Sequence, residues 1–160
     1  MTSQELQQYL LREFPQENAR CEWKEMKNLK NLFAGDEKNV ISYVAVIANM
    51  EGGHLVIGVQ DKTLEIVGTD LSKFNLNAQS AVWKLLEHCT NLSSEGLSID
   101  EYTTEDSHKT VWIIHIPKHL PRRPVYAHKK AWQRVEDSLV EMTQERLAAI
   151  LEEPVFEAKD

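Results

Sequence analysis

The sequence has few of the residues that mark secreted, zinc-clamped or membrane-embedded chains. Cys21 and Cys89 are its only cysteines in 160 residues, and their spacing fits neither a disulfide framework nor a zinc motif. No apolar run approaches the ~18 residues of a membrane span. The N-terminal MTSQELQQYL lacks the basic-then-apolar order of a secretion signal. These absences predict a cytoplasmic, non-membrane protein, and the length fits a single domain over residues 1–160.

Positive charge is scarce in the whole chain but concentrated in one segment. The formal net charge is −7, which disfavours a polyanionic partner if taken alone. Residues 118–134, KHLPRRPVYAHKKAWQR, contain six of the 18 Lys and Arg and no acidic residue, so 12 Lys and Arg face 25 acids elsewhere. This segment, which we call the basic strip, is typical of an anion-facing surface. The alternative is a solvated loop whose charges only maintain solubility.

The basic strip combines cations with aromatic residues, as nucleic-acid-binding surfaces do. Tyr126 and Trp132 are candidates to stack on unpaired bases, although aromatic residues at alternating strand positions are more often buried in a core. The candidates for phosphate contacts are the cations Arg122, Arg123, Lys129, Lys130 and Arg134.

Hydrophobic periodicity predicts an α+β fold, with a mixed, mostly antiparallel sheet and flanking helices. We expect an N-terminal helix within residues 1–14, capped by Thr2 or Ser3, and a second helix capped by Asp36 or Asn39. Two further helices are expected over 77–88 and 143–152. The extended segments are 20–26, 54–60, 64–70, 96–106 and 109–117.

Two adjacent glycines join the second helix to the most apolar strand in the segment 48–61, ANMEGGHLVIGVQD. Gly52 and Gly53 suit a helix C-terminus that needs a positive φ, and the missing Cβ lets another strand or a ligand approach closely. Gly53 and Gly58 also have Gly-x-x-x-x-Gly spacing. A P-loop requires Lys-Ser or Lys-Thr next, whereas Val-Gln follows here, which excludes that phosphate cradle.

Acidic residues near two predicted strands suggest a metal site. Glu22 lies in one strand and Asp61 follows another, so adjacent strands would bring the two carboxylates together, and Glu17 could fold back as a third. Three oxygen ligands suit Mg²⁺ or Mn²⁺, which can align a phosphodiester and activate water. Lys24 would then stabilise charge on the phosphate. The alternative is surface salt bridges of these acids to Lys24 and Lys27.

Three separated segments together resemble the Schlafen AlbA-like domain, a family described as DNA-binding and also as divergent AAA ATP-binding. They are ENARCEWK, VIANMEGGHLVIGVQDKTLEIVG and RPVYAHKKAWQRVEDS, and the match spans about residues 17–140. The family pattern includes Glu-x4-Glu-Phe-Lys, Ala-Asn-x-x-Gly-Gly, Ile-Gly-Val-x-Asp, Pro-Val-Tyr and aromatic-x-Arg. The chain departs from it with Asn18 for Ser, Trp23 for Phe and Met50 for Thr, and it keeps every carboxylate.

The resemblance implies an α+β domain that binds RNA or DNA, which suits a transcriptional regulator. In members that cleave RNA, carboxylates at positions matching Glu17, Glu22 and Asp61 hold the metal, so a metal-dependent endoribonuclease is the alternative function. Those members place two related lobes together, and this chain offers one, which a homodimer would complete. A second alternative is an ATP-binding or protein-interaction domain. The sequence by itself establishes no cofactor, and the carboxylate site would take Mg²⁺ or Mn²⁺.

Overall fold

The computed structural model describes residues 1–15, 20–25, 39–69, 77–136 and 138–155. These residues form four helices and eight strands, with one parallel strand pair among otherwise antiparallel pairs. The predicted α+β class is therefore confirmed, and the strands divide between two four-stranded sheets. Among the described residues, no helix has the length and apolar composition that crossing a bilayer requires.

Each helix begins after a residue whose side-chain oxygen accepts a backbone N–H of the first turn. Thr2 also forms a reciprocal capping box with Glu5. Of the two caps considered for the second helix, Asn39 is the one observed, and Asp36 lies outside the described residues. The helices are α1 (Ser3–Glu13), α2 (Val40–Asn49), α3 (Ala78–His88) and α4 (Gln144–Leu151), capped by Thr2, Asn39, Asn77 and Thr143.

The first sheet is covered on both faces. Its strands are β1 (Cys21–Lys24), β2 (Gly53–Ile57), β4 (Ser98–Thr103) and β5 (Thr110–Ile116), in the order β1-β2-β5-β4. Alternate apolar residues of β2 and β5 pack with α1 on one face and with α2 and α3 on the other. Burial on both faces explains why residues 54–60 and 109–117 are almost continuously apolar.

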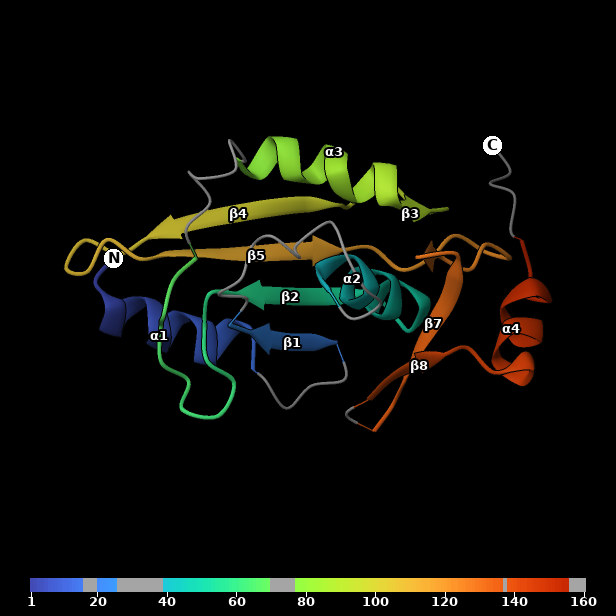
Figure 1. Ribbon diagram of the computed structural model, residues 1–160, viewed down its shortest axis with the longest axis horizontal. Coiled ribbons are helices and arrows are strands. Elements are labelled where there is room, and N and C mark those ends of the chain that lie inside the picture. The colour runs from blue at the N-terminus through green and yellow to red at the C-terminus, as the bar shows by residue number, and fades with distance from the viewer. Residues whose placement is uncertain (16–19, 26–38, 70–76, 137, 156–160) are drawn as a thin grey trace.

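The second sheet is smaller and lies at the α4 end of the molecule (Figure 1). It contains β3 (Cys89–Thr90), β6 (Tyr126–Ala127), β7 (Lys130–Val135) and β8 (Ser138–Glu141), antiparallel in the order β3-β6-β7-β8. Sequence periodicity did not predict these strands: two of them have only two residues, and β7 lies mostly within the basic strip, where charged residues interrupt the apolar pattern. Apolar residues of α2 pack against both sheets, so this helix is the shared centre of the core.

The two adjacent glycines have the roles predicted for them. Gly52 has φ +76°, and its N–H donates to the carbonyl of Ile47 at the end of α2, 2.9 Å away. A Cβ on Gly53 would overlap the carbonyl oxygen of Arg20, just before β1. The missing Cβ of Gly53 therefore allows β1 and β2 to lie side by side.

The side chain of Asn49, at the end of α2, joins this helix to the β6–β7 hairpin. Its Nδ2 donates to the carbonyls of Val125 and Trp132, both at 2.9 Å, and its Oδ1 accepts the N–H of Val125 at 2.7 Å. Asn49 is fully buried, so water cannot replace these partners. Its backbone carbonyl also accepts a hydrogen bond from Arg146 of α4.

We predict that Asn49→Ala destabilises the fold by about 3 kcal/mol, because three buried backbone groups lose their partner and each costs roughly 1–3 kcal/mol. Urea unfolding followed by circular dichroism measures the change. Gln8→Ala, at an exposed position of α1, is the control and should stay within about 0.5 kcal/mol of wild type. Equal stability of the Asn49 variant and wild type would contradict the anchoring role.

Both thiols are buried, and we predict that they are unreactive in the folded protein. Burial raises the pKa of Cys21 to about 11 and that of Cys89 to about 12, so almost no thiolate exists at pH 8. Mass spectrometry after iodoacetamide treatment should show no alkylation under native conditions and two modified cysteines after guanidinium unfolding. Alkylation of the native protein at the rate of a free thiol would contradict this.

Candidate functional site

The predicted carboxylate site is only partly covered by the described residues. β1 and β2 are adjacent and parallel, with Glu22 opposite Leu55, as the site requires. Asp61 is exposed in the turn that follows β2. Glu17 lies outside the described residues, so the site of Glu17, Glu22 and Asp61 stays a prediction. No group of three His, Cys, Asp or Glu within the described ranges is placed to hold a metal ion.

Each carboxylate oxygen of Glu22 lies near a cation. Its Oε2 is 2.8 Å from a guanidinium nitrogen of Arg134, and its Oε1 is 3.4 Å from Nζ of Lys24. The Glu22 side chain is 15% exposed, so this charge is mostly withdrawn from water. Two adjacent cations oppose the approach of a third, and the observed arrangement of Glu22 therefore fits an ion-pair anchor better than a metal ligand.

Lys24 is held between Glu22 and an aromatic ring. Its Nζ lies 4.8 Å from the ring centre of Tyr43 in α2. Burial lowers the pKa of Lys24, but the interactions with Tyr43 and Glu22 outweigh this effect and raise the pKa above its usual value. Lys24 therefore remains a fixed positive charge at the outer strand of the first sheet.

Three cations of the basic strip are exposed on turns at the two ends of β6: Arg122, Arg123 and Lys129. The two-residue turn between β6 and β7 consists of His128 and Lys129, with φ +52° and +65°, the signs of a type I′ turn. Arg122 also has a positive φ, +63°. Such conformations are costly for residues other than glycine and tend to occur at functional sites. His128 Nε2 lies 3.0 Å from Oδ1 of Asn39, which anchors the turn.

The other predicted members of the strip are less accessible. Trp132 is 3% exposed, and its Nε1 donates to the carbonyl of Ala127 at 2.7 Å. The prediction that Trp132 stacks on a base is therefore wrong, because this position of β7 points into the core, which was the stated alternative. Lys130 is partly buried, with Nζ 5.9 Å from the Trp132 ring centre. Tyr126 is also partly buried and keeps some exposed surface.

The start of the strip is bonded to the segment that follows α4, a contact that the sequence did not indicate. Arg122 Nε donates to the carbonyl of Glu153 at 2.8 Å. The buried ring of His119 has Nε2 2.8 Å from the Glu153 carboxylate and Nδ1 2.9 Å from the carbonyl of Ala48. These contacts hold the Arg122 turn against α2 and α4.

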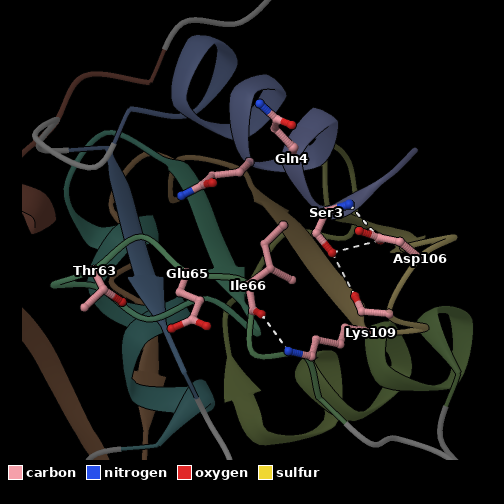
Figure 2. Close-up of a pocket in the computed structure, with 9 residues that line it drawn as sticks. Ser3, Gln4, Thr63, Glu65, Ile66, Asp106 and Lys109 are labelled. Atoms are coloured by element: carbon pink, nitrogen blue, oxygen red, sulfur yellow. Dashed lines mark hydrogen bonds between the residues drawn. The ribbon is translucent and has the colours of Figure 1, made fainter.

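A polar cleft of ≈ 600 Å³ lies away from the strip, and Figure 2 shows its lining. It is bounded by α1, by residues 63–66 and by the turn between β4 and β5. Several polar groups that line it form hydrogen bonds to one another. Ser3 Oγ donates to Asp106 at 2.9 Å, and Lys109 Nζ donates to the carbonyl of Ile66 at 3.3 Å. None of the site residues that the sequence predicted and the structure describes lines this cleft.

A smaller cleft of ≈ 270 Å³ lies at the strip itself. Three residues of the strip line it, together with residues from α2, from the end of α3 and from β3. Its lining residues are Ile41, Glu87, His88, Thr90, Tyr126, His128 and Lys129. An apolar wall, an aromatic residue and a cation thus lie together at the edge of the second sheet.

We predict that the pair of Glu22 and Arg134 shows a coupling energy of at least about 1 kcal/mol in a double-mutant cycle with Glu22→Gln and Arg134→Gln, measured by urea unfolding. Mostly buried partners are weakly screened by water, which makes their coupling stronger. The exposed pair of Lys84 and Glu87, 3.9 Å apart, is the control and should couple by less than about 0.5 kcal/mol. Equal coupling in both cycles would contradict the anchor.

Two of the solved structures that this chain matches are a crystal structure and a solution NMR structure. The crystal structure of DIP2311 from Corynebacterium diphtheriae is 19% identical with a TM-score of 0.60, over 86% of this chain and 28% of that one. The solution NMR structure of the N-terminal domain of a RecG-related protein from Nitrosomonas europaea is 20% identical with a TM-score of 0.45, over 80% of this chain and 81% of that one. The first likeness supports the fold, and the chain spans only 28% of the length of DIP2311.

A search of curated proteins found no match. The family comparison agrees with the motifs, because the sequence matches the family described as Schlafen, AlbA_2 over residues 17–143. Most of the chain lies within this match, so the protein belongs to the Schlafen AlbA_2 family.

Proposed function

We propose that this protein binds nucleic acid, RNA or DNA, through the exposed cations of the basic strip. The observation that carries the proposal is the position of Arg122, Arg123 and Lys129, all exposed on turns at the ends of β6. Cations on short, well-anchored turns can contact successive phosphates of a backbone at little cost in conformational entropy. Membership of the Schlafen AlbA_2 family supports the same general function.

The charge distribution supports a narrow contact surface. Two cations of the strip are engaged by acids from elsewhere, Arg134 by Glu22 and Lys118 by Glu51. The remainder of the chain is strongly acidic, so a polyanion would be repelled beyond the strip. Lys130 is partly buried, so we expect about three phosphate contacts, from the exposed Arg122, Arg123 and Lys129, rather than the six that a count of Lys and Arg suggests.

The small cleft beside Lys129 favours a strand with unpaired bases. Tyr126 lines this cleft and retains exposed surface, so it can contact a base that the strand turns toward the protein. Ile41 supplies an apolar wall in the same cleft. A base inside a duplex could not enter it without being unstacked, which costs a few kcal/mol. We therefore extend the proposal to single-stranded RNA or DNA.

The other functions considered from the sequence stay predictions. A Mg²⁺- or Mn²⁺-dependent endoribonuclease would need Glu22 as a ligand, and Glu22 pairs here with Lys24 and Arg134. ATP binding, protein interaction, transcriptional regulation and homodimer formation likewise stay predictions.

We predict that binding of a fluorescent single-stranded oligonucleotide weakens steeply with salt, and that Arg122→Ala with Arg123→Ala reduces this dependence. Each lost phosphate contact should lower the slope of log K against log salt by about 0.7. Fluorescence anisotropy between about 50 and 200 mM salt measures the slope. Lys62→Ala with Lys84→Ala removes two exposed cations outside the strip and should leave the slope unchanged. Salt-independent binding, or an equal effect of both double variants, would overturn the phosphate contacts.

A further inference from the structure

Two histidines face each other on the first sheet. His54 of β2 and His115 of β5 are directly opposite in the strand register. Their Nδ1 atoms are 3.1 Å apart, and the other ring nitrogen of His115, Nε2, is 2.7 Å from Oδ2 of Asp100 in β4. Three neighbouring strands thus supply a connected chain of carboxylate, imidazole and imidazole.

The distance between the two Nδ1 atoms is that of two ligands on one metal ion. Zn²⁺ binds imidazole nitrogen at about 2.0–2.1 Å. Two such ligands are then about 2.9 Å apart at the right angle of a square-planar site and about 3.4 Å apart at the tetrahedral angle. The observed separation of 3.1 Å lies between these values.

We propose that His54 and His115 bind a transition-metal ion of the Zn²⁺, Ni²⁺ or Cu²⁺ class through their Nδ1 atoms. Imidazole nitrogen suits these ions, whereas Mg²⁺ and Mn²⁺ prefer oxygen ligands. The site is therefore separate in chemistry from the predicted carboxylate site. It is also separate in space, since His54 shares a face of β2 with Val56, under α1, while Leu55 and Ile57 pack with α2.

Asp100 lies where a carboxylate commonly orients a metal-bound histidine. Such histidines usually donate their second ring N–H to a carboxylate, which holds the ring and makes its ligating nitrogen more basic. His115 Nε2–H donates to Asp100, so in the neutral ring its Nδ1 carries a lone pair.

Without a metal, a hydrogen bond between the two rings holds them together. With the Nδ1 lone pair on His115, the hydrogen bond between the rings requires an N–H at Nδ1 of His54. On metal binding, this proton leaves Nδ1 of His54 and Nε2 of the same ring takes one up, by exchange with water. Both rings stay neutral, and both then present a lone pair to the ion.

The residues around the two histidine rings leave the site partly open to solvent. The ring of Phe14 lies with its centre 4.8 Å from that of His54 and 6.0 Å from that of His115, and forms an apolar wall. The His115 side chain is 26% exposed, which leaves a route for the ion. Among the described residues, no group of three His, Cys, Asp or Glu is placed to hold an ion, and Asp100 bonds to the far ring nitrogen of His115. Water or another molecule would complete the coordination, so the affinity should be lower than that of a four-ligand structural site.

The test uses the full chain, freed of metal by a chelator and dialysed. Calorimetric titration with ZnCl₂ in the presence of excess MgCl₂ should show one Zn²⁺ ion bound per chain, because Mg²⁺ does not compete for imidazole ligands. His54→Gln and His115→Gln should each weaken Zn²⁺ binding at least ~10-fold, and Asp100→Asn about 10–100-fold. His108→Gln, which alters an exposed histidine in the turn between β4 and β5, is the matched control and should change nothing.

Electron paramagnetic resonance of the Cu²⁺-loaded protein provides a readout of ligand identity. Two imidazole nitrogens should couple to the ion in wild type and in His108→Gln, and one in His54→Gln. Circular dichroism verifies that each variant is folded, and Asp100, half exposed, provides a variant that leaves the core intact. Absence of stoichiometric Zn²⁺ binding, or binding unchanged in both His54→Gln and His115→Gln, would overturn the proposal. Either result leaves nucleic-acid binding by the strip unaffected.

Discussion

The side-chain amide of Asn49 is the interaction on which the arrangement of the two sheets depends. Asn49 is the last residue of the helix that both sheets share, and its side chain satisfies two backbone groups of Val125, just before β6, and one of Trp132 in β7. A buried amide can do this because it offers donors and an acceptor in one plane, and its loss would leave polar groups in the core. With the hairpin fixed, Arg134 of β7 reaches Glu22 of β1, so the motif residue Asn49 serves structure and also positions the strip.

Acids distant in sequence restrict how much of the basic strip is available. Glu22 engages Arg134, and Glu153 binds His119 through its carboxylate and Arg122 through its carbonyl. These contacts are short and partly shielded from water, so they organise the strip more than they neutralise it. The cations that remain exposed lie on two turns, in which Arg122 and Lys129 have positive φ angles.

The first sheet carries different chemistry on its two faces. On the α2 face, Glu22, Lys24 and Tyr43 form an ionic and aromatic cluster at the outer strand. On the α1 face, His54 and His115 form an imidazole pair beside Phe14. The period of two along a strand separates these groups completely, because neighbouring residues of one strand point to opposite faces.

Local patterns in the sequence were enough to predict the helices and the long strands, and they narrowed the first two caps to Thr2 or Ser3 and to Asp36 or Asn39. Asn39, Asn77 and Thr143 cap helices because a side-chain oxygen at that position satisfies a nearby N–H, an effect confined to one turn. The tertiary structure alone decided which distant residues meet. His54 and His115 are 61 positions apart, and only the pairing of β2 with β5 makes them neighbours. A shift of one residue in that register would place them on opposite faces of the sheet, and a local pattern does not specify which distant strand β2 pairs with.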